Sequence, residues 1–413
     1  MKAQKNLQKY LQRNKYLHHR LEPQVSDGVK FATCIVIVAC AEYDYLGRLL
    51  DSLNNVDDIE NCAVIVVVNH KHDVDITVKE QNILTLQELA NNNKGKFRDF
   101  SHYKILLGKN LFYVDAVNNL LTAHAKKFFG VGAARKIGLD LVLNLLEFNG
   151  EIEPLLICLD ADCVVKKNYL MAIKECFSRN KNIVGGVCDF KHLRSENKLQ
   201  NLAIDEYEKF MDNYVEGLKF ANSPYAFYAL GSAIVCTANA YVAVNGMVVK
   251  EAGEDFYFLQ KLCKLGKLSA IPTTVYPDSR ISQRVPFGTG TKIAEIVDNS
   301  INGNSSNEEP QIVLQHYNFN VFVELKKIYD AVLIHKENKD LANIANFLSC
   351  KIDDKYIKTF FKEQNFSSAW DKIIKNTPLD PQAQERAFNV WFDGFKILKL
   401  IHFLEQYQQF KRI

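Results

Sequence analysis

The sequence predicts an α/β fold in which a mainly parallel central sheet is covered by helices and followed by a helical C-terminal region. Three apolar runs, at 31–40, 62–68 and 155–160, have the composition of strands that are buried on both faces of a parallel sheet. Patterns of helical period lie between these runs. Only helical patterns follow residue 310, and the length of 413 residues is enough for two or three domains.

The composition excludes several classes of protein. Hydrophobic residues make up 47% of the chain and charged residues 24%, which excludes a disordered chain. The 51 Lys and Arg residues and 48 Asp and Glu residues give a net charge of +3, too balanced for a dedicated nucleic-acid-binding protein. The ten cysteines include no CxxC pair, so we expect buried free thiols and no zinc site.

Residues 1–30 form a basic arm with a local charge of +5. Leu7, Tyr10 and Leu11 recur at near-helical spacing among basic residues, which predicts a helix that either rests on anionic lipid or is solvated. The longest apolar run, 31–41, is too short to span a membrane, and we interpret it as a buried strand rather than a signal peptide. We therefore expect a cytoplasmic protein whose membrane contact, if any, is peripheral, on the inner face, through this arm.

The elements after the first strand follow the order of a covered α/β sheet. An amphipathic helix at 45–53 comes next, and the second strand ends in the polar turn 69–73 (NHKHD). In such sheets ligands bind beyond the carboxyl ends of the strands. Further elements are expected at 78–92 (helix), 133–148 (helix), 155–160 (strand), 169–178 (helix), 183–190 (strand) and 228–237 (strand).

The segment 298–310 (DNSINGNSSNEEP) has the composition of a linker. It separates a predicted domain at 31–297 from a helical region at 311–413. The helical region contains a set of aromatic residues at near-helical spacing, which includes Trp370, Trp391, Phe392 and Phe395. We interpret this set as core, with a platform for an acceptor sugar as the alternative.

Two carboxylates, Asp160 and Asp162, follow the third strand directly. Residues i and i+2 of an extended chain point to the same side, so both carboxylates are expected at the edge of the sheet. Hard oxygen ligands of this kind suit Mg²⁺ or Mn²⁺, which also accept phosphate oxygens from a nucleotide. The alternative is a pair of solvated acids in a turn.

A second acidic pair, Glu254 and Asp255, lies in the first turn of a predicted helix. One interpretation is that the acids only complement the helix dipole. The other is a general base at the rim of a pocket, which takes a proton from an acceptor hydroxyl.

Two glycine-containing segments carry arginines. In 282–290 (SQRVPFGTG), a loop with Arg284 can either close over an anion or simply connect two elements. In 130–136 (GVGAARK), glycines lead into a helix that carries Arg135, a candidate for contact with a phosphate or a base. The second segment matches neither GxGxxG nor the Walker spacing.

The order of these motifs resembles a GT-A glycosyltransferase of family 2, over about residues 31–290. Glu42 stands where the family has the Glu of a Pro-x-Tyr-Asn-Glu-like turn. NHKHD is similar to the family's Asn-Asn-Ser-x-Asp turn, which makes Asn69 and Asp73 candidates for contact with the base. Gly132 to Arg135 is similar to the start of the Gly-x-Ala-Arg-Asn helix, with Lys136 in place of Asn.

The resemblance implies a role for each candidate. Asp160 and Asp162 would hold a divalent ion on the diphosphate of a nucleotide sugar, and Asp255 would be the base of a single inverting displacement. Glu254 would position the acceptor or the base, and Arg284 would stabilise the leaving diphosphate. His316 would complete the metal shell, unless it is an ordinary packing or surface histidine.

The expected function is therefore metal-dependent transfer of a sugar from a nucleotide-sugar donor to a hydroxyl of a glycan or glycolipid in surface polysaccharide synthesis. A UDP-sugar is the first choice of donor and a GDP-sugar the second. Three alternatives stay open: a retaining enzyme, a nucleotidyltransferase acting on sugar phosphates, and a binding scaffold of the same fold without turnover. No nucleic-acid partner is expected.

Overall fold

The structure is a computed structural model that divides into two compact units. The first unit comprises Met1–Asn201 and Ala229–Glu295, and the second comprises Leu202–Tyr228 and Ile296–Ile413. The predicted border at 297 lies next to the start of Ile296–Ile413, but Leu202–Tyr228 was predicted to belong to the first domain. The described residues are 2–14, 19–71, 73–92, 99–100, 103–104, 110–117, 130–148, 153–250, 253–281, 289–303, 312, 314–338 and 343–410.

An eight-stranded sheet forms the centre of the first unit, in the order β5-β2-β1-β6-β9-β8-β10-β7. The strands β5, β2, β1 and β6 pair in parallel, as do β8 and β10, whereas β9 and β7 run antiparallel to their neighbours. The α/β fold with a mainly parallel sheet is thus confirmed. The strands are β1 (Thr33–Ala39), β2 (Cys62–Val68), β5 (Leu111–Asp115), β6 (Leu155–Asp160), β7 (Val164–Val165), β8 (Ile183–Phe190), β9 (Ile234–Thr237) and β10 (Lys267–Tyr276). A separate antiparallel pair is formed by β3 (Asp99–Phe100) and β4 (Tyr103–Lys104).

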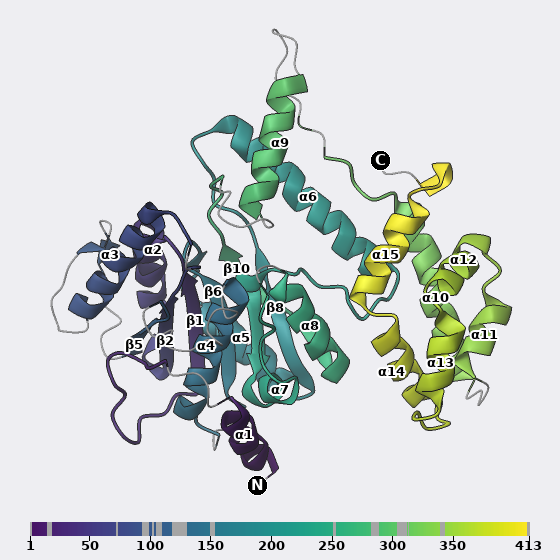
Figure 1. The fold of residues 1–413 in the computed structure, drawn as a ribbon, viewed down its shortest axis with the longest axis horizontal. Coiled ribbons are helices and arrows are strands. Elements are labelled where there is room, and N and C mark those ends of the chain that lie inside the picture. The colour runs from purple at the N-terminus through teal and green to yellow at the C-terminus, as the bar shows by residue number, and fades with distance from the viewer. Residues whose placement is uncertain are drawn as a thin grey trace. The chain divides into compact units, whose positions relative to one another are not determined.

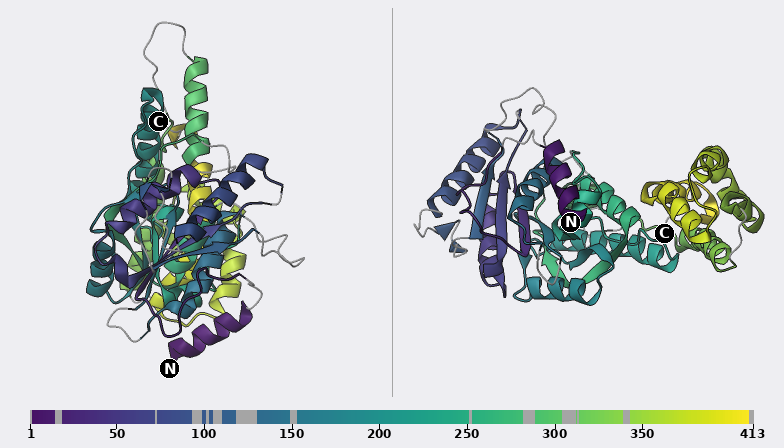
Figure 2. Two further views of the ribbon diagram at one scale, coloured as in Figure 1. Left: turned by 90° about the vertical axis from the view of Figure 1, so that its left-hand side faces the viewer. Right: turned by 90° about the horizontal axis from the view of Figure 1, so that it is seen from below.

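The strands form where the sequence has continuous apolar runs. Every residue of β1 and β2 is buried, because helices pack against the sheet (Figures 1 and 2). All ten cysteines are free thiols, and six of them are buried, as predicted; Cys40, Cys176 and Cys263 are half-buried and Cys350 is exposed. Burial raises the pKa of Cys62 and Cys158 to about 12. The helices of this unit are α1 (Lys2–Arg13), α2 (Tyr43–Asn54), α3 (Ile76–Asn92), α4 (Val131–Val142), α5 (Tyr169–Arg179), α7 (Ala238–Ala243) and α8 (Glu254–Leu265).

The predicted basic arm at residues 1–30 contains the helix α1, and this helix belongs to the first unit. Leu7 and Tyr10 are buried, and the Tyr10 hydroxyl donates to Oδ1 of Asp140 at 2.7 Å and accepts from Nζ of Lys136 at 2.7 Å. The apolar face of this helix is therefore covered by protein. Among the described residues, no helix is long and apolar enough to cross a membrane.

The second unit is helical, which confirms the helical C-terminal region. Its core includes the fully buried side chains of Trp370, Phe322, Phe360 and Phe388, so the interpretation of Trp370 as core is correct. Trp391 and Phe392 are likewise buried, and the ring centre of Trp391 lies 4.4 Å from that of Phe366. Phe395 of the same set is exposed, so the interpretation as core is wrong for this residue. The helices are α10 (Phe319–Glu337), α11 (Ile344–Lys351), α12 (Lys355–Glu363), α13 (Phe366–Ile374), α14 (Pro381–Trp391) and α15 (Gly394–Leu404).

Two further helices, α6 (Lys198–Phe220) and α9 (Thr289–Gly303), each begin in the first unit and continue into the second. The predicted linker at 298–310 therefore begins inside a helix. Its first six residues are the last turns of α9, whereas 304–310 lie outside the described residues.

Candidate functional site

The carboxyl ends of three parallel strands meet at one edge of the sheet. Ala39 of β1 pairs with Val68 of β2, and Val38 pairs with Asp160 of β6. The residues that follow each strand are tied together by the backbone, since the N–H of Asn69 donates to the carbonyl of Ala39 at 3.1 Å. This geometry brings the predicted residues Glu42, Asn69, Asp160 and Asp162 to the same edge.

The first group of side chains at this edge is the Arg135 cluster, formed by Arg135, Asp160, Glu254 and Asp255. Arg135 lies on α4 with only 2% of its side chain exposed, and its Nη2 donates to Oδ1 of Asp160 at 2.5 Å. Its Nη1 donates to Oε1 of Glu254, at the first position of α8. Arg135 thus joins the acid of the strand to the acid of the helix.

Glycines leave the space that the Arg135 cluster needs. A Cβ at Gly231 would lie 2.2 Å from Nη2 of Arg135, so any larger residue there would displace the guanidinium. A Cβ at Gly132 would lie 2.6 Å from the carbonyl oxygen of Val248, so this glycine lets the start of α4 approach the segment before α8. Gly231 therefore makes room for the guanidinium, and Gly132 of the predicted motif makes room for the backbone before α8.

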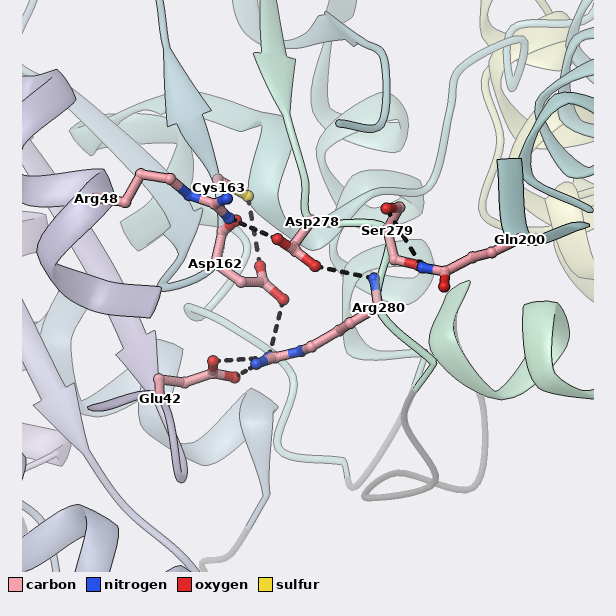
Figure 3. Close-up of polar contacts among 8 residues, drawn as sticks. All are labelled: Glu42, Arg48, Asp162, Cys163, Gln200, Asp278, Ser279 and Arg280. Atoms are coloured by element: carbon pink, nitrogen blue, oxygen red, sulfur yellow. Dashed lines mark hydrogen bonds and ion pairs between the residues drawn. The ribbon is translucent and has the colours of Figure 1, made fainter. Parts of the chain in front are cut away.

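The second group is the Arg280 cluster, formed by Arg280, Glu42, Asp162 and Tyr45, of which Figure 3 shows the first three. Nη2 of Arg280 lies 2.6 Å from both carboxylate oxygens of Glu42 and 3.0 Å from Oδ2 of Asp162. The guanidinium carbon lies 3.9 Å from the centre of the Tyr45 ring, close enough for a cation–π interaction. The cluster therefore joins the start of α2, the turn after β6 and the segment after β10.

A set of polar contacts fixes the backbone around Arg280 (Figure 3). Oδ1 of Asp278 accepts from the N–H of Arg280 at 2.9 Å, and its Oδ2 accepts from Nη2 of Arg48 at 2.6 Å. Nε2 of Gln200 donates to the carbonyl oxygen of Ser279. The backbone at Arg280 is thus held by the side chains of Asp278 and Gln200.

Acidic residues outnumber basic residues at this edge. Burial, together with the Glu42 carboxylate, raises the pKa of Asp162 to about 7, although Arg280 opposes the shift. Burial likewise raises the pKa of Glu254 to about 7 and raises that of Asp255, and Arg135 opposes both shifts. The two clusters and their supporting pair contain six acids and three arginines, namely Glu42, Asp160, Asp162, Glu254, Asp255, Asp278, Arg48, Arg135 and Arg280.

The carboxylate oxygens at this edge fit a divalent ion that is bound together with a substrate. Asp160 and Asp162 supply carboxylate oxygens at an edge with excess negative charge, and 37% of the Asp160 side chain is exposed. Within the described part of the chain, no group of three His, Cys, Asp or Glu side chains is arranged to hold a metal by itself. Mg²⁺ and Mn²⁺ sites of this type are commonly completed by water and phosphate oxygens.

The structure places the other predicted residues as follows. The Asn69 side chain is buried, and its Nδ2 donates to the carbonyl oxygen of Gly130 at 3.1 Å, which ties the end of β2 to the start of α4. Asp73 is exposed in the turn after β2. Among the described contacts, none joins Asp73 to either cluster. Arg284 lies outside the described residues.

His316 belongs to the second unit, whereas Asp160 and Asp162 belong to the first. Its Nε2 lies 3.8 Å from Oε2 of Glu206, and its ring packs edge-on against Phe210 at 6.3 Å. Within its own unit His316 is thus a packing residue beside an acid.

Sequence reasoning missed Arg280, Tyr45 and Arg48. The signal for Arg280 was its place in PDSR, directly after a strand, in the way that Asp162 follows β6. That strand, β10, was not predicted. The predicted arginine of this region, Arg284, lies four residues further on.

The comparisons with known proteins give structural similarity only. No family model matches the sequence, and no curated protein matches it. Among solved structures, the chain is similar to S. aureus TarS 1–349 in complex with UDP-GlcNAc, with 12% identity over 86% of this chain and 90% of that chain and a TM-score of 0.42. It is also similar to S. aureus TarS 1–349 in complex with UDP, with 12% identity over 91% of each chain and a TM-score of 0.39. At this level of similarity, the chemistry of the site rests on its own residues.

Proposed function

We propose that this protein is a metal-dependent, inverting glycosyltransferase of the GT-A fold and of family 2. It would move a sugar from a UDP-sugar to a hydroxyl of a glycan or glycolipid in surface polysaccharide synthesis. The observation that carries the proposal is that Arg135 joins the strand-end acid Asp160 to Glu254, which places a donor-side acid and an acceptor-side acid in one site.

The donor side consists of carboxylates and arginines at the edge of the sheet. Asp160 and Asp162 would hold Mn²⁺ or Mg²⁺ against the diphosphate of the nucleotide. The ion supplies charge neutralisation for the leaving diphosphate. Glu42 and Asn69 would contact the nucleotide, as the resemblance implies. Arg284 remains a proposed partner of the diphosphate.

The acceptor side is the start of α8. Asp255 is less buried than Glu254, and its Oδ1 accepts from the N–H of Phe256 at 2.7 Å, which fixes its rotamer. Its raised pKa improves its match to a hydroxyl proton, as a general base requires. Asp255 would take this proton as the acceptor oxygen attacks the anomeric carbon and the nucleoside diphosphate leaves from the opposite face.

Glu254 would serve as a positioning residue. Only 4% of its side chain is exposed, and one of its oxygens is bound by Arg135. It therefore holds the start of α8, with Asp255, at a fixed distance from the acids of the strand.

The test is thermal unfolding of the full chain with UDP, GDP or CDP, each with and without Mn²⁺, on the wild type and on Asp162→Asn. A ligand at 100 times its Kd stabilises the folded state by about 2.7 kcal/mol, which gives a measurable increase in Tm. We expect the increase with UDP and Mn²⁺ together, and we expect Asp162→Asn to lose it.

Other outcomes would change the proposal. An increase with GDP alone would change the donor, and no increase with any nucleotide would favour a binding scaffold without turnover. NMR of the sugar released from a UDP-sugar by hydrolysis shows whether the anomeric carbon is inverted, which separates an inverting enzyme from a retaining one.

We also propose a cytoplasmic location with peripheral contact to the membrane through basic residues of α1.

A further inference from the structure

Nη2 of Arg280 lies where a small cation would lie among these carboxylates. It is 2.6 Å from both oxygens of Glu42 and 3.0 Å from Oδ2 of Asp162, so three carboxylate oxygens surround one nitrogen. A guanidinium Nη2 carries only two hydrogens, so two donors are shared among three acceptors. A divalent ion would satisfy the same oxygens more completely, because its charge is not directional.

The backbone of Arg280 is fixed, whereas its side chain is long enough to change partners. Asp278 accepts from the Arg280 N–H at 2.9 Å, and Gln200 binds the preceding carbonyl, of Ser279. Beyond the backbone, the side chain has four rotatable bonds, and only 16% of it is exposed. A change of partner therefore needs a change of rotamer and no movement of β10.

The charges make simultaneous occupation unfavourable. A divalent ion on Asp162 would lie within a few ångströms of the Arg280 guanidinium, and two cations at such a distance repel each other strongly at low dielectric. A diphosphate brought in with the ion offers the guanidinium a new partner, since arginine binds phosphate oxygens in a bidentate way.

We propose that Arg280 changes partners during donor binding. Before the donor arrives, it neutralises Glu42 and Asp162. When the divalent ion binds Asp162, the guanidinium leaves that carboxylate and binds the diphosphate of the donor. The inference rests on the proposed function, from which it takes the diphosphate, and it adds competition between Arg280 and the ion for Asp162.

The test measures binding without turnover. Mn²⁺ alone is titrated into the full chain, and free Mn²⁺ is followed by its EPR signal, for the wild type and Arg280→Gln. We expect about tenfold tighter Mn²⁺ binding in Arg280→Gln. A factor of this size means that, in the wild type, Arg280 leaves Asp162 open to the ion for about one-tenth of the time. We expect about tenfold or greater weakening of UDP binding at saturating Mn²⁺, because the charge-assisted hydrogen bonds are lost.

Arg179→Gln is the matched control. Arg179 lies at the end of α5 in an exposed pair with Glu175, and it belongs to neither cluster. We expect its Mn²⁺ affinity to stay within twofold of the wild type. Arg280→Lys keeps the charge without the planar fork, and we expect changes in the same two directions but smaller. If Arg280→Gln does not fold, as judged by circular dichroism, Arg280→Lys decides the question.

Opposite changes in the two affinities support the inference. Equal or weaker Mn²⁺ binding in Arg280→Gln would overturn it, as would unchanged UDP binding. If UDP binds neither the wild type nor any variant, the proposed function fails. Tighter Mn²⁺ binding in Arg280→Gln would then still support competition for Asp162, while the transfer to a diphosphate would be refuted.

Discussion

Arg135 binds Asp160 through Nη2 at 2.5 Å and Glu254 through Nη1, so one buried guanidinium connects the end of β6 to the start of α8. These two elements are 94 residues apart in the chain. In the proposed enzyme, one carries the acids that face the donor and the other carries the base. The distance between the two halves of the reaction therefore depends on this arginine.

The first prediction concerns Arg135→Gln. The variant leaves Glu254 buried without its cation, and breaking a buried pair by removing one partner costs about 3–5 kcal/mol. We expect a loss of this size in the free energy of unfolding in urea at pH 7.5. Lys174→Gln is the control, because its partially exposed pair with Asp58 should contribute less than about 1 kcal/mol. A loss of similar size in both variants would contradict the structural role of Arg135.

The second prediction concerns pH. Burial raises the pKa of Glu254 from an ordinary value of 4.5 to about 7, so between these values the folded chain holds a proton that the unfolded chain has released. The free energy of unfolding should therefore fall as the pH rises from about 4.5 to 7 and level off above 7.

In Glu254→Gln this contribution is absent. We expect the decrease between pH 5 and pH 8, measured by urea unfolding, to be smaller than in the wild type by about 1–3 kcal/mol. Glu175→Gln, which removes an exposed acid from a surface pair, should keep the wild-type slope. The same slope in Glu254→Gln as in the wild type would show that Glu254 is already ionised at pH 5.

The third prediction concerns the attachment of α1. Tyr10→Phe removes the hydroxyl that bridges Asp140 and Lys136 and leaves part of a buried polar group unsatisfied. We expect a loss of about 1–3 kcal/mol in the free energy of unfolding, because desolvated polar groups without partners are costly. Lys9→Gln, on the exposed face of the same helix, should stay within about 0.5 kcal/mol of the wild type. Equal stability of Tyr10→Phe and wild type would mean that the bridge contributes nothing net.

The fourth prediction concerns lipid. Because Leu7 and Tyr10 are buried, contact of α1 with a membrane can use only its exposed basic residues, which include Lys5, Lys9 and Arg13. We expect cosedimentation with anionic liposomes that falls as salt rises, and that is lost when these three residues are replaced by Glu. Binding that persists in 0.5 M salt would point to apolar insertion by another surface.

Some strands were predicted from the sequence and others, among them β5, β7 and β10, were not; for β10 the reason is physical. A strand buried on both faces reads as a continuous apolar run, so β1, β2 and β6 were found. In β10, buried and exposed residues are mixed, and Pro272 lies in the irregular pairing with β8 between Ile271 and Thr274. Proline is tolerated in a sheet at such irregularities, but in a sequence it counts against a strand.

The site was found where its residues follow a recognised strand. Asp160 is the last residue of β6 and Asp162 lies two residues further on, and their spacing alone places them at the edge of the sheet. Arg280 binds carboxylates that are 118 and 238 residues away in sequence, and no local pattern contains that pairing. The burial of Arg135 was missed for the same reason, because both of its acidic partners are distant in the chain.

The last prediction tests the base. In Asp255→Asn the side chain keeps its size, and its amide oxygen can still accept from the N–H of Phe256, but it cannot take a proton. We expect sugar transfer to fall by about a hundredfold or more, the usual contribution of a general base, while UDP affinity in the presence of Mn²⁺ stays within about threefold. The control is Asp189→Asn, which changes an exposed acid at the end of β8 and should leave both quantities unchanged. Full transfer activity in Asp255→Asn would exclude Asp255 as the base, and loss of UDP binding together with activity would move it to the donor side of the site.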